Sequence, residues 1–145
     1  MPPIRAKIPK TYQRILFSAL ALSWCSGVCF FVLSTWFMVE GEFGPEKHPW
    51  QYPSLMVHGG AAFLMIFCYG ALLASHVTSA WPLKRSRITG LSIAIAVGLQ
   101  IITAYLLYYL ASESLRVWTV NVHLTVGFCL PLLLVFHLVA GKRGK

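Results

Sequence analysis

Long apolar runs alternate with short polar segments along the chain. The apolar runs cover, approximately, residues Ile15–Met38, Ser54–Ser79, Ile88–Leu110 and Val117–Ala140. A helix needs about 20 consecutive apolar residues to cross the hydrocarbon layer of a bilayer, and every run has that length. The pattern therefore predicts four transmembrane helices and leaves little sequence for a soluble domain.

The connections between these runs predict how the helices are arranged. The second connection, Ala80–Arg87, and the third, Ala111–Arg116, are short, so consecutive helices are expected to be antiparallel neighbours. The first connection, Val39–Pro53, is longer and contains three prolines, which argue against continuous helix. We expect an outer loop there, which either docks a partner or covers a site, or is an ordinary interfacial loop. The predicted fold is all-α: an integral membrane up-down-up-down four-helix bundle.

Composition and charge also place the chain in a membrane. Of its 145 residues, 57% are hydrophobic and only 11% are charged, which excludes an ordinary soluble globular domain. Ten of the twelve Lys and Arg residues lie before the first run, in the second connection or after the fourth run, whereas all four Glu residues lie in the other two connections. The positive-inside rule then places both termini in the cytoplasm. We expect a multi-pass protein of the inner (cytoplasmic) membrane, in contact with the lipid bilayer and not with nucleic acid.

Three parts of the chain follow from this topology. Residues 1–14 form a basic cytoplasmic arm, residues 15–141 a four-helix transmembrane domain, and residues 142–145 a basic cytoplasmic tail. The first apolar run is too long for a signal peptide and no small-residue cleavage site ends it, so we expect it to be retained as the first span.

Two of the predicted helices carry a histidine near each end. His58 and His76 are 18 residues apart in the second run, about five whole helical turns, so both are expected on one face of that helix. His123 and His137 are 14 residues apart in the fourth run, roughly 40° short of four turns, and also share a side. Because these two helices are expected to be parallel, His58 and His123 would lie near the outer surface and His76 and His137 near the inner one.

Four histidines at matched depths indicate metal ligation. A polar group inside the bilayer costs free energy unless it is paired, so its repetition needs a reason. Zinc favours ligands that converge on one point, whereas each helix here holds its two histidines roughly 21 to 27 Å apart. Haem needs only two axial imidazoles from facing helices. Small residues one turn below the outer histidines, Ala62 and Gly127, would leave room for a porphyrin, although small residues also serve plain helix packing.

The paired histidines resemble a known family, the membrane diheme cytochromes b. Those on the second and fourth helices resemble the four-helix haem-binding core of the bc1/b6f cytochromes b, and the spacing from His123 to His137 is similar to that family and to bacterial cytochrome b561. The resemblance covers roughly residues 15–140. The longer spacing of His58 and His76 departs from it and is nearer to the cytochrome b subunits of nitrate reductases. No CxxCH motif for covalent haem attachment is present.

The resemblance implies a cofactor set and a role. Two non-covalent haems b would be six-coordinate, with no vacancy for a substrate, so electron transfer across the membrane is expected. The chain would connect the quinone pool with a redox partner subunit, such as a cytochrome c, an iron–sulfur protein or a flavoprotein. Arg116 would meet the propionates of the outer haem, and Arg85 and Arg87 those of the inner haem.

Other interpretations of the same residues stay open. The chain alone could be a quinone-coupled oxidoreductase similar to cytochrome b561, so its status as an enzyme is undecided, or it could be a non-haem membrane anchor or metal transporter. Tyr105, Tyr108 and Tyr109 suit an aromatic belt better than a quinone pocket. Gln100, in the middle of the third run, is expected to bridge two helices. His48, in the outer loop, has no partner at ligand spacing and is excluded from the ligands.

Overall fold

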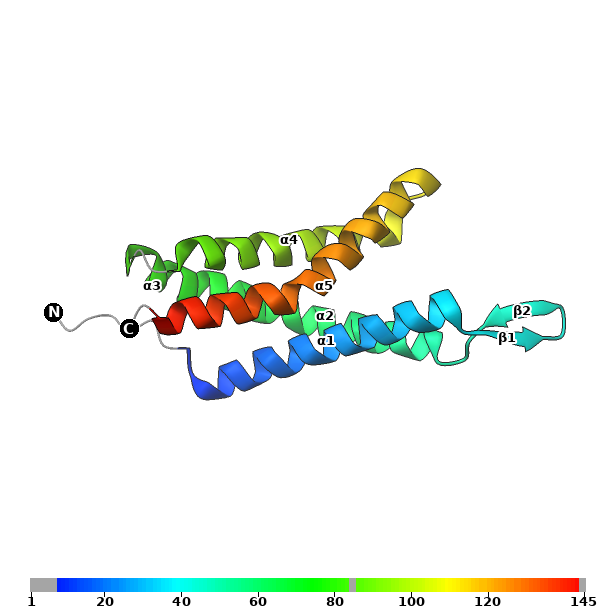
Figure 1. Cartoon of the computed structure of the whole chain (residues 1–145), viewed down its shortest axis with the longest axis horizontal. Helices are drawn as coiled ribbons and strands as arrows, with labels where there is room; N and C mark the ends of the chain where they lie inside the picture. The colour runs from blue at the N-terminus through cyan, green and yellow to red at the C-terminus, as the bar shows by residue number, and fades with distance from the viewer. Residues whose placement is uncertain (1–7, 84–85, 144–145) are drawn as a thin grey trace. The chain divides into compact units, whose positions relative to one another are not determined.

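The structure, a computed structural model, is mostly helical and describes residues 8–83 and 86–143. Its elements in chain order are α1 Lys10–Trp36, β1 Met38–Gly41, β2 Gly44–Lys47, α2 Gln51–Leu72, the π-helical turn η1 Leu73–Val77, α3 Thr78–Ala80, the 3-10 turn η2 Trp81–Leu83, α4 Arg87–Tyr109 and α5 Glu113–Arg143 (Figure 1). Most of the predicted basic arm, residues 1–7, and the end of the predicted tail, residues 144–145, lie outside the described residues.

Four helical segments are long and apolar enough to cross a membrane, as the sequence predicts. They are Lys10–Trp36, Gln51–Ala80, Arg87–Tyr109 and Glu113–Lys142. The first and the last begin four or more residues before the apolar runs do, because polar residues continue the helix beyond the apolar stretch. The backbone N–H of Gln13 donates to the carbonyl of Pro9, and this bond closes the first turn of α1. Glu113 lies in the first turn of α5, where the helix dipole favours a carboxylate.

The side chains on these helices are arranged for an apolar solvent. The buried residues of the described chain are mostly small, such as Ala19, Ala61 and Ala96, whereas large apolar side chains point outwards. Phe67 is 76% exposed and Phe136 is 66% exposed. Such an extended apolar surface would be costly in water but is the expected surface of a protein in lipid. These observations support a multi-pass membrane protein.

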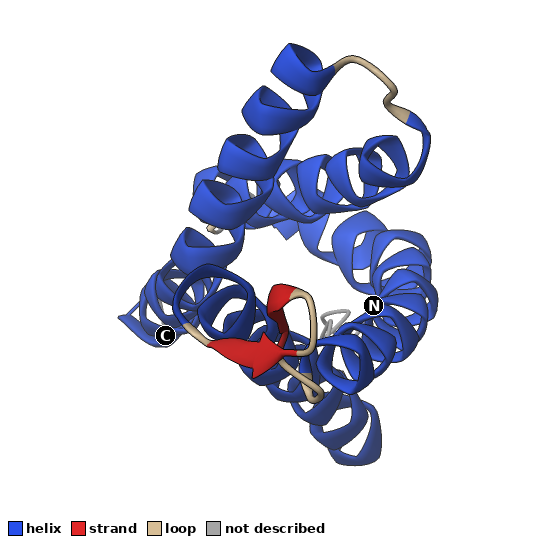
Figure 2. Ribbon diagram, turned by 90° about the vertical axis from the view of Figure 1, so that its right-hand side faces the viewer, coloured by secondary structure: helices blue, strands red, loops and turns tan. Residues whose placement is uncertain are grey.

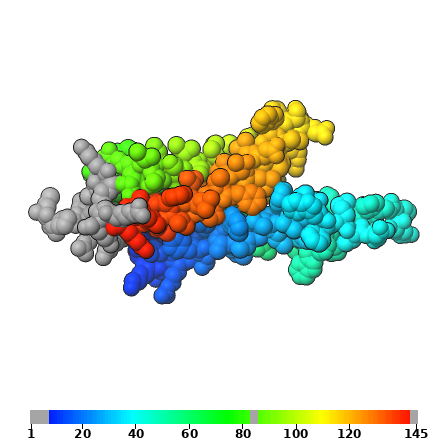
Figure 3. Space-filling model, in the orientation of Figure 1, coloured from blue at the N-terminus to red at the C-terminus, as the bar shows by residue number. Residues whose placement is uncertain are grey.

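The described residues separate into two compact units, residues 8–71 and residues 72–143 without 84 and 85. In the first unit, α1 and α2 form a helical hairpin joined by the strands β1 and β2. The strands pair antiparallel, from Met38 opposite Lys47 to Gly41 opposite Gly44 (Figure 2). Gly44 ends the turn with a φ of +118°, a conformation that other residues rarely adopt. The β-hairpin projects beyond the ends of α1 and α2 (Figure 3).

This β-hairpin differs from the irregular loop expected over Val39–Pro53. The three prolines do exclude a continuous helix, but Pro45 is tolerated in the short strand β2, opposite Glu40. Pro53 lies in the first turn of α2, where a missing backbone N–H is harmless.

In the second unit, α4 and α5 pack against each other as an antiparallel hairpin joined by residues 110–112. The helix α5 changes direction part-way along its length (Figure 1). Pro131 lies inside it and removes the backbone donor that would bond the carbonyl of Gly127, which accounts for a bend at this level. The helical segment before α4 contains the π-helical turn Leu73–Val77 and ends with the 3-10 turn Trp81–Leu83.

Candidate functional site

Both histidines of α5 are hydrogen-bonded to threonines of α4. The Nδ1 atom of His123 lies 2.9 Å from the hydroxyl oxygen of Thr103, and the Nδ1 atom of His137 lies 2.9 Å from that of Thr89. The two threonines are 14 residues apart, as are the two histidines. In an antiparallel hairpin, residues at equal distances from the turn face each other. The two helices therefore present the same pair of side chains at two levels.

The threonine contacts favour one tautomer of each imidazole. The Thr103 hydroxyl lies 2.7 Å from the carbonyl of Leu99, and the Thr89 hydroxyl lies 3.1 Å from the carbonyl of Ser86. A carbonyl can only accept, and with the hydroxyl proton on it the threonine oxygen accepts from the histidine. This arrangement places the proton of each neutral ring on Nδ1 and leaves the lone pair on Nε2.

His58 has the same tautomer in the other unit. Its Nδ1 lies 2.8 Å from the backbone carbonyl of Ser23 in α1, so Nδ1 must donate. Gly27, one turn further along α1, lies against the ring. A methyl group built on Gly27 would come within 2.9 Å of both Nδ1 and Cε1 of His58, too close for an alanine to fit without movement.

His76 is held differently. It lies in the π-helical turn Leu73–Val77, and its buried Nδ1 atom has no hydrogen-bond partner among the described residues. His76 and His137, the predicted inner pair, belong to the same unit. His58 and His123, the predicted outer pair, belong to different units.

The π-helical turn also changes the rotation about the helix axis that separates His58 from His76. A single π-turn acts like the insertion of one residue into an α-helix, which rotates the residues that follow by about 100°. The spacing of 18 residues between His58 and His76 therefore does not translate into five regular α-helical turns.

Gln100 bridges two helices, as predicted. Its Nε2 atom donates to the backbone carbonyl of His123 at 3.1 Å. A methyl group on Gly127 would come within 2.5 Å of this amide nitrogen. The small size of Gly127, predicted to make room for a porphyrin, thus makes room for Gln100. Ala62, predicted for the same role beside His58, is partly buried.

The predicted propionate-binding arginines have partners within their own unit. Arg116 donates to the carbonyl of Leu107 at 2.6 Å and so caps the end of α4. The Nε atom of Arg87 donates to the carbonyl of Trp81 at 2.9 Å, and its guanidinium lies 4.9 Å from the centre of the Trp81 ring. Arg85 lies outside the described residues.

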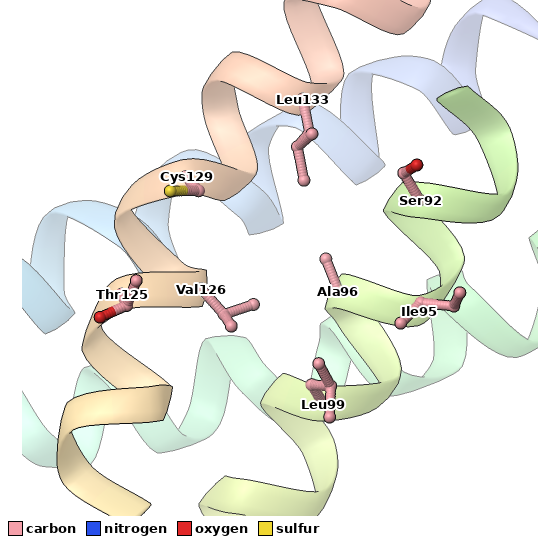
Figure 4. Close-up of a pocket in the computed structure, with 8 residues that line it drawn as sticks. All are labelled: Ser92, Ile95, Ala96, Leu99, Thr125, Val126, Cys129 and Leu133. Atoms are coloured by element: carbon pink, nitrogen blue, oxygen red, sulfur yellow. The ribbon is translucent and has the colours of Figure 1, made fainter. Parts of the chain in front are cut away.

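An apolar hollow lies between α4 and α5, midway between the two threonine–histidine levels. It has a volume of about 320 Å³. Its lining residues are Ser92, Ile95, Ala96, Leu99, Thr125, Val126, Cys129 and Leu133 (Figure 4). Two of its lining residues, Cys129 and Leu133, lie on either side of Pro131 in the sequence of α5.

The donor set suits a metal that takes only two ligands from the protein. Among residues 8–83 and 86–143, no three side chains of His, Cys, Asp or Glu are grouped so that they could hold a metal ion. Haem iron has four equatorial bonds to the porphyrin and takes axial imidazoles. Histidines that ligate metals usually donate their second ring N–H to an oxygen, the arrangement seen at His58, His123 and His137. The residues therefore fit this group.

Sequence reasoning missed the residues that hold the rings: Ser23, Gly27, Thr89, Gly90 and Thr103. Gly90 adjoins His137, because a methyl group built on it would lie 3.4 Å from Cε1 of the ring. A signal for the threonines was present, since Thr89 and Thr103 repeat the 14-residue spacing of the histidines on the neighbouring antiparallel helix. Ser23 acts through its backbone carbonyl, which no residue type reveals.

Comparison with protein-family models, with curated proteins and with solved structures finds no match to this chain.

Proposed function

We propose that this chain is a membrane diheme cytochrome b that transfers electrons across the membrane between the quinone pool and a redox partner subunit. The main support for the proposal is that three histidines have the same tautomer and the same kind of hydrogen bond. His58, His123 and His137 each use Nδ1–H on an oxygen acceptor and keep the lone pair on Nε2. This is the tautomer and support that an iron ligand requires.

The four histidines would hold two haems b. His58 and His123 would be the axial ligands of an outer haem, and His76 and His137 those of an inner haem. A haem with two axial imidazoles supplies one-electron chemistry at iron and leaves no open coordination position in its resting state. The chain itself contributes ring orientation and an apolar surrounding.

The threonines would tune this chemistry through the imidazoles. An oxygen acceptor on Nδ1–H increases the electron density of the ring and favours the more highly charged, oxidised iron. Thr103 and Thr89 would therefore lower the reduction potentials of the two haems, compared with rings that have no acceptor.

The charge distribution supports one orientation of the chain in the membrane. The basic segments favour cytoplasmic termini in the inner membrane, with the β-hairpin on the opposite side.

Arg116 and Arg87 use one or two of their five N–H donors on backbone carbonyls, and their remaining donors would serve the propionates. The exposed tyrosines Tyr105 and Tyr109, whose ring centres are 4.7 Å apart, suit the headgroup level at the end of α4.

Visible spectroscopy of the purified full chain tests the proposal. We expect reduced-minus-oxidised spectra of a b-type cytochrome and a pyridine haemochrome titration that gives about two haems per chain. His58→Ala and His137→Ala should each lose one haem. His48→Ala is the matched control, because His48 accepts from the backbone N–H of Trp50 in the segment between β2 and α2 and should leave both haems in place.

The outcomes separate the alternatives. A colourless protein would refute the proposal and favour a membrane anchor or metal transporter. Equal haem loss in His48→Ala would refute the assigned ligands. Quinone-dependent turnover by the chain alone would favour a stand-alone oxidoreductase similar to cytochrome b561 over a subunit.

A further inference from the structure

The two histidines of the predicted inner pair are supported unequally. His137 is bonded through Nδ1 to Thr89 at 2.9 Å, and Gly90 lies beside its ring. The Nδ1 atom of His76 is buried and lacks a partner among the described residues. A ligating histidine without this second bond typically binds its metal about 10–100-fold more weakly. Ligation at this level is therefore expected to be weaker on the His76 side.

The backbone around His76 is irregular as well. In an α-helix the N–H of Thr78 would bond the carbonyl of Ala74, but here it bonds the carbonyl of Ser75. The Thr78 hydroxyl takes the place of that donor, at 2.8 Å from the Ala74 carbonyl and 3.1 Å from that of Ser75. The side chain of Thr78 thus stabilises the π-turn that carries His76. Such turns occur often at functional sites.

We propose that His76 is an exchangeable ligand and that the inner haem site binds a small neutral diatomic molecule on the His76 side. The inference rests on the proposed function, since it needs a haem between His76 and His137. In the exchange, the bond from Nε2 of His76 to ferrous iron breaks and a bond from iron to the diatomic forms. No electron is transferred, and His76 leaves as a neutral imidazole, so no proton moves.

His137 would stay bound during this exchange. Its hydrogen bond continues to the carbonyl of Ser86 through the Thr89 hydroxyl, so the ring is held by a chain of two bonds to α4 and its N-cap residue. The site would thus have a fixed side on α5 and a variable side on the π-turn. The outer site would lack this asymmetry, because His58 and His123 both have Nδ1 partners.

Carbon monoxide is the probe for the test. The purified full chain is reduced without oxygen and titrated with CO while the visible bands are recorded. We expect about half of the total haem to form a CO complex and the other half to stay unchanged. The rate should level off at high CO, because dissociation of His76 then limits it.

Some outcomes of this experiment would refute the inference about His76 and leave the proposed function unaffected. A protein with two haems that binds no CO would show that His76 is a firm ligand. A rate that rises linearly with CO throughout would show that His76 is not bound to iron at all. Loss of the CO complex only when Thr103 or His123 is replaced would place the exchange at the wrong haem. Absence of haem would instead refute the proposed function.

Discussion

Replacing Thr103 by valine tests whether a threonine hydroxyl controls His123, a proposed haem ligand. Valine has nearly the same shape as threonine, so the change removes the acceptor of His123 together with the hydroxyl's bond to the Leu99 carbonyl. Thr103 is only 6% exposed, and water is not expected to replace the lost hydroxyl. The Nδ1–H group of His123 would then lose its partner at 2.9 Å. The expected cost in stability is about 1–3 kcal/mol, the typical cost of a buried donor without an acceptor.

The same change should alter a reduction potential. A hydrogen bond near a charged centre is stronger than a neutral one, so part of the bond energy of Thr103, about 1 kcal/mol, should favour the oxidised haem. For one electron, 59 mV corresponds to about 1.4 kcal/mol, so the potential of the outer haem should rise by about 40 mV in Thr103→Val. The inner haem should change much less, because its ligands make no contact with Thr103 in the described structure.

Potentiometric titration of the purified protein, followed in the visible bands, measures this shift. Thr103→Ser keeps the hydroxyl and should restore the original potential. Thr119→Val is a matched control, since Thr119 donates to the carbonyl of Leu115 at 2.8 Å and is not a partner of His123. An unchanged potential in Thr103→Val, a fall, or an equal rise in Thr119→Val would refute the reasoning.

Three further predictions follow from the same contacts. Thr89→Val should raise the potential of the inner haem by about 40 mV and leave the outer one nearly unchanged, which the same titration measures. Gly27→Ala should lower the content of the outer haem in a pyridine haemochrome assay, because the new methyl group would lie 2.9 Å from the ring of His58. Gly70→Ala is the control and should keep both haems, because a methyl group there finds open space within the described chain. Gln100→Leu should change thermal stability little: the bond to His123 is lost, about 0.6 kcal/mol in a membrane helix pair, but the buried Oε1 of Gln100, which has no described partner, is removed as well. A fall of the melting temperature by more than a few degrees would contradict this balance.

The membrane spans could be predicted from sequence because one physical length sets them. The thickness of the hydrocarbon layer requires about 20 apolar residues, and each run meets that requirement. The ends could not be placed in the same way. Lys10 and Glu113 extend their helices through polar residues that an apolar window does not include.

The short elements were beyond sequence reasoning for a different reason. The β-hairpin uses two strands of four residues each, in which Gly and Pro weaken the alternation that marks a strand. The π-turn at Leu73–Val77 has an ordinary helical composition, and its stabilising bond comes from the hydroxyl of Thr78 after the turn. Periodicity assumes one constant rotation per residue, so it cannot detect a local change of that rotation.

The candidate ligands came from sequence, whereas their supports came from structure. Histidines inside apolar runs are conspicuous because buried polar groups are rare there. Their acceptors are either ordinary helix threonines, Thr89 and Thr103, or the carbonyl of Ser23, which belongs to the backbone. Such partners become visible only when neighbouring helices are placed side by side.

The fixed rings of α5 bear on the speed of an electron transfer as well as on its driving force. An electron moves quickly between two sites when few atoms must shift as the charge changes. His123 and His137 are tied to helix carbonyls through Thr103 and Thr89, so their dipoles already point in the required direction before any charge arrives. The α4–α5 hairpin would therefore keep the reorganisation energy of both haems small, and any slow nuclear motion would be concentrated at the π-turn around His76.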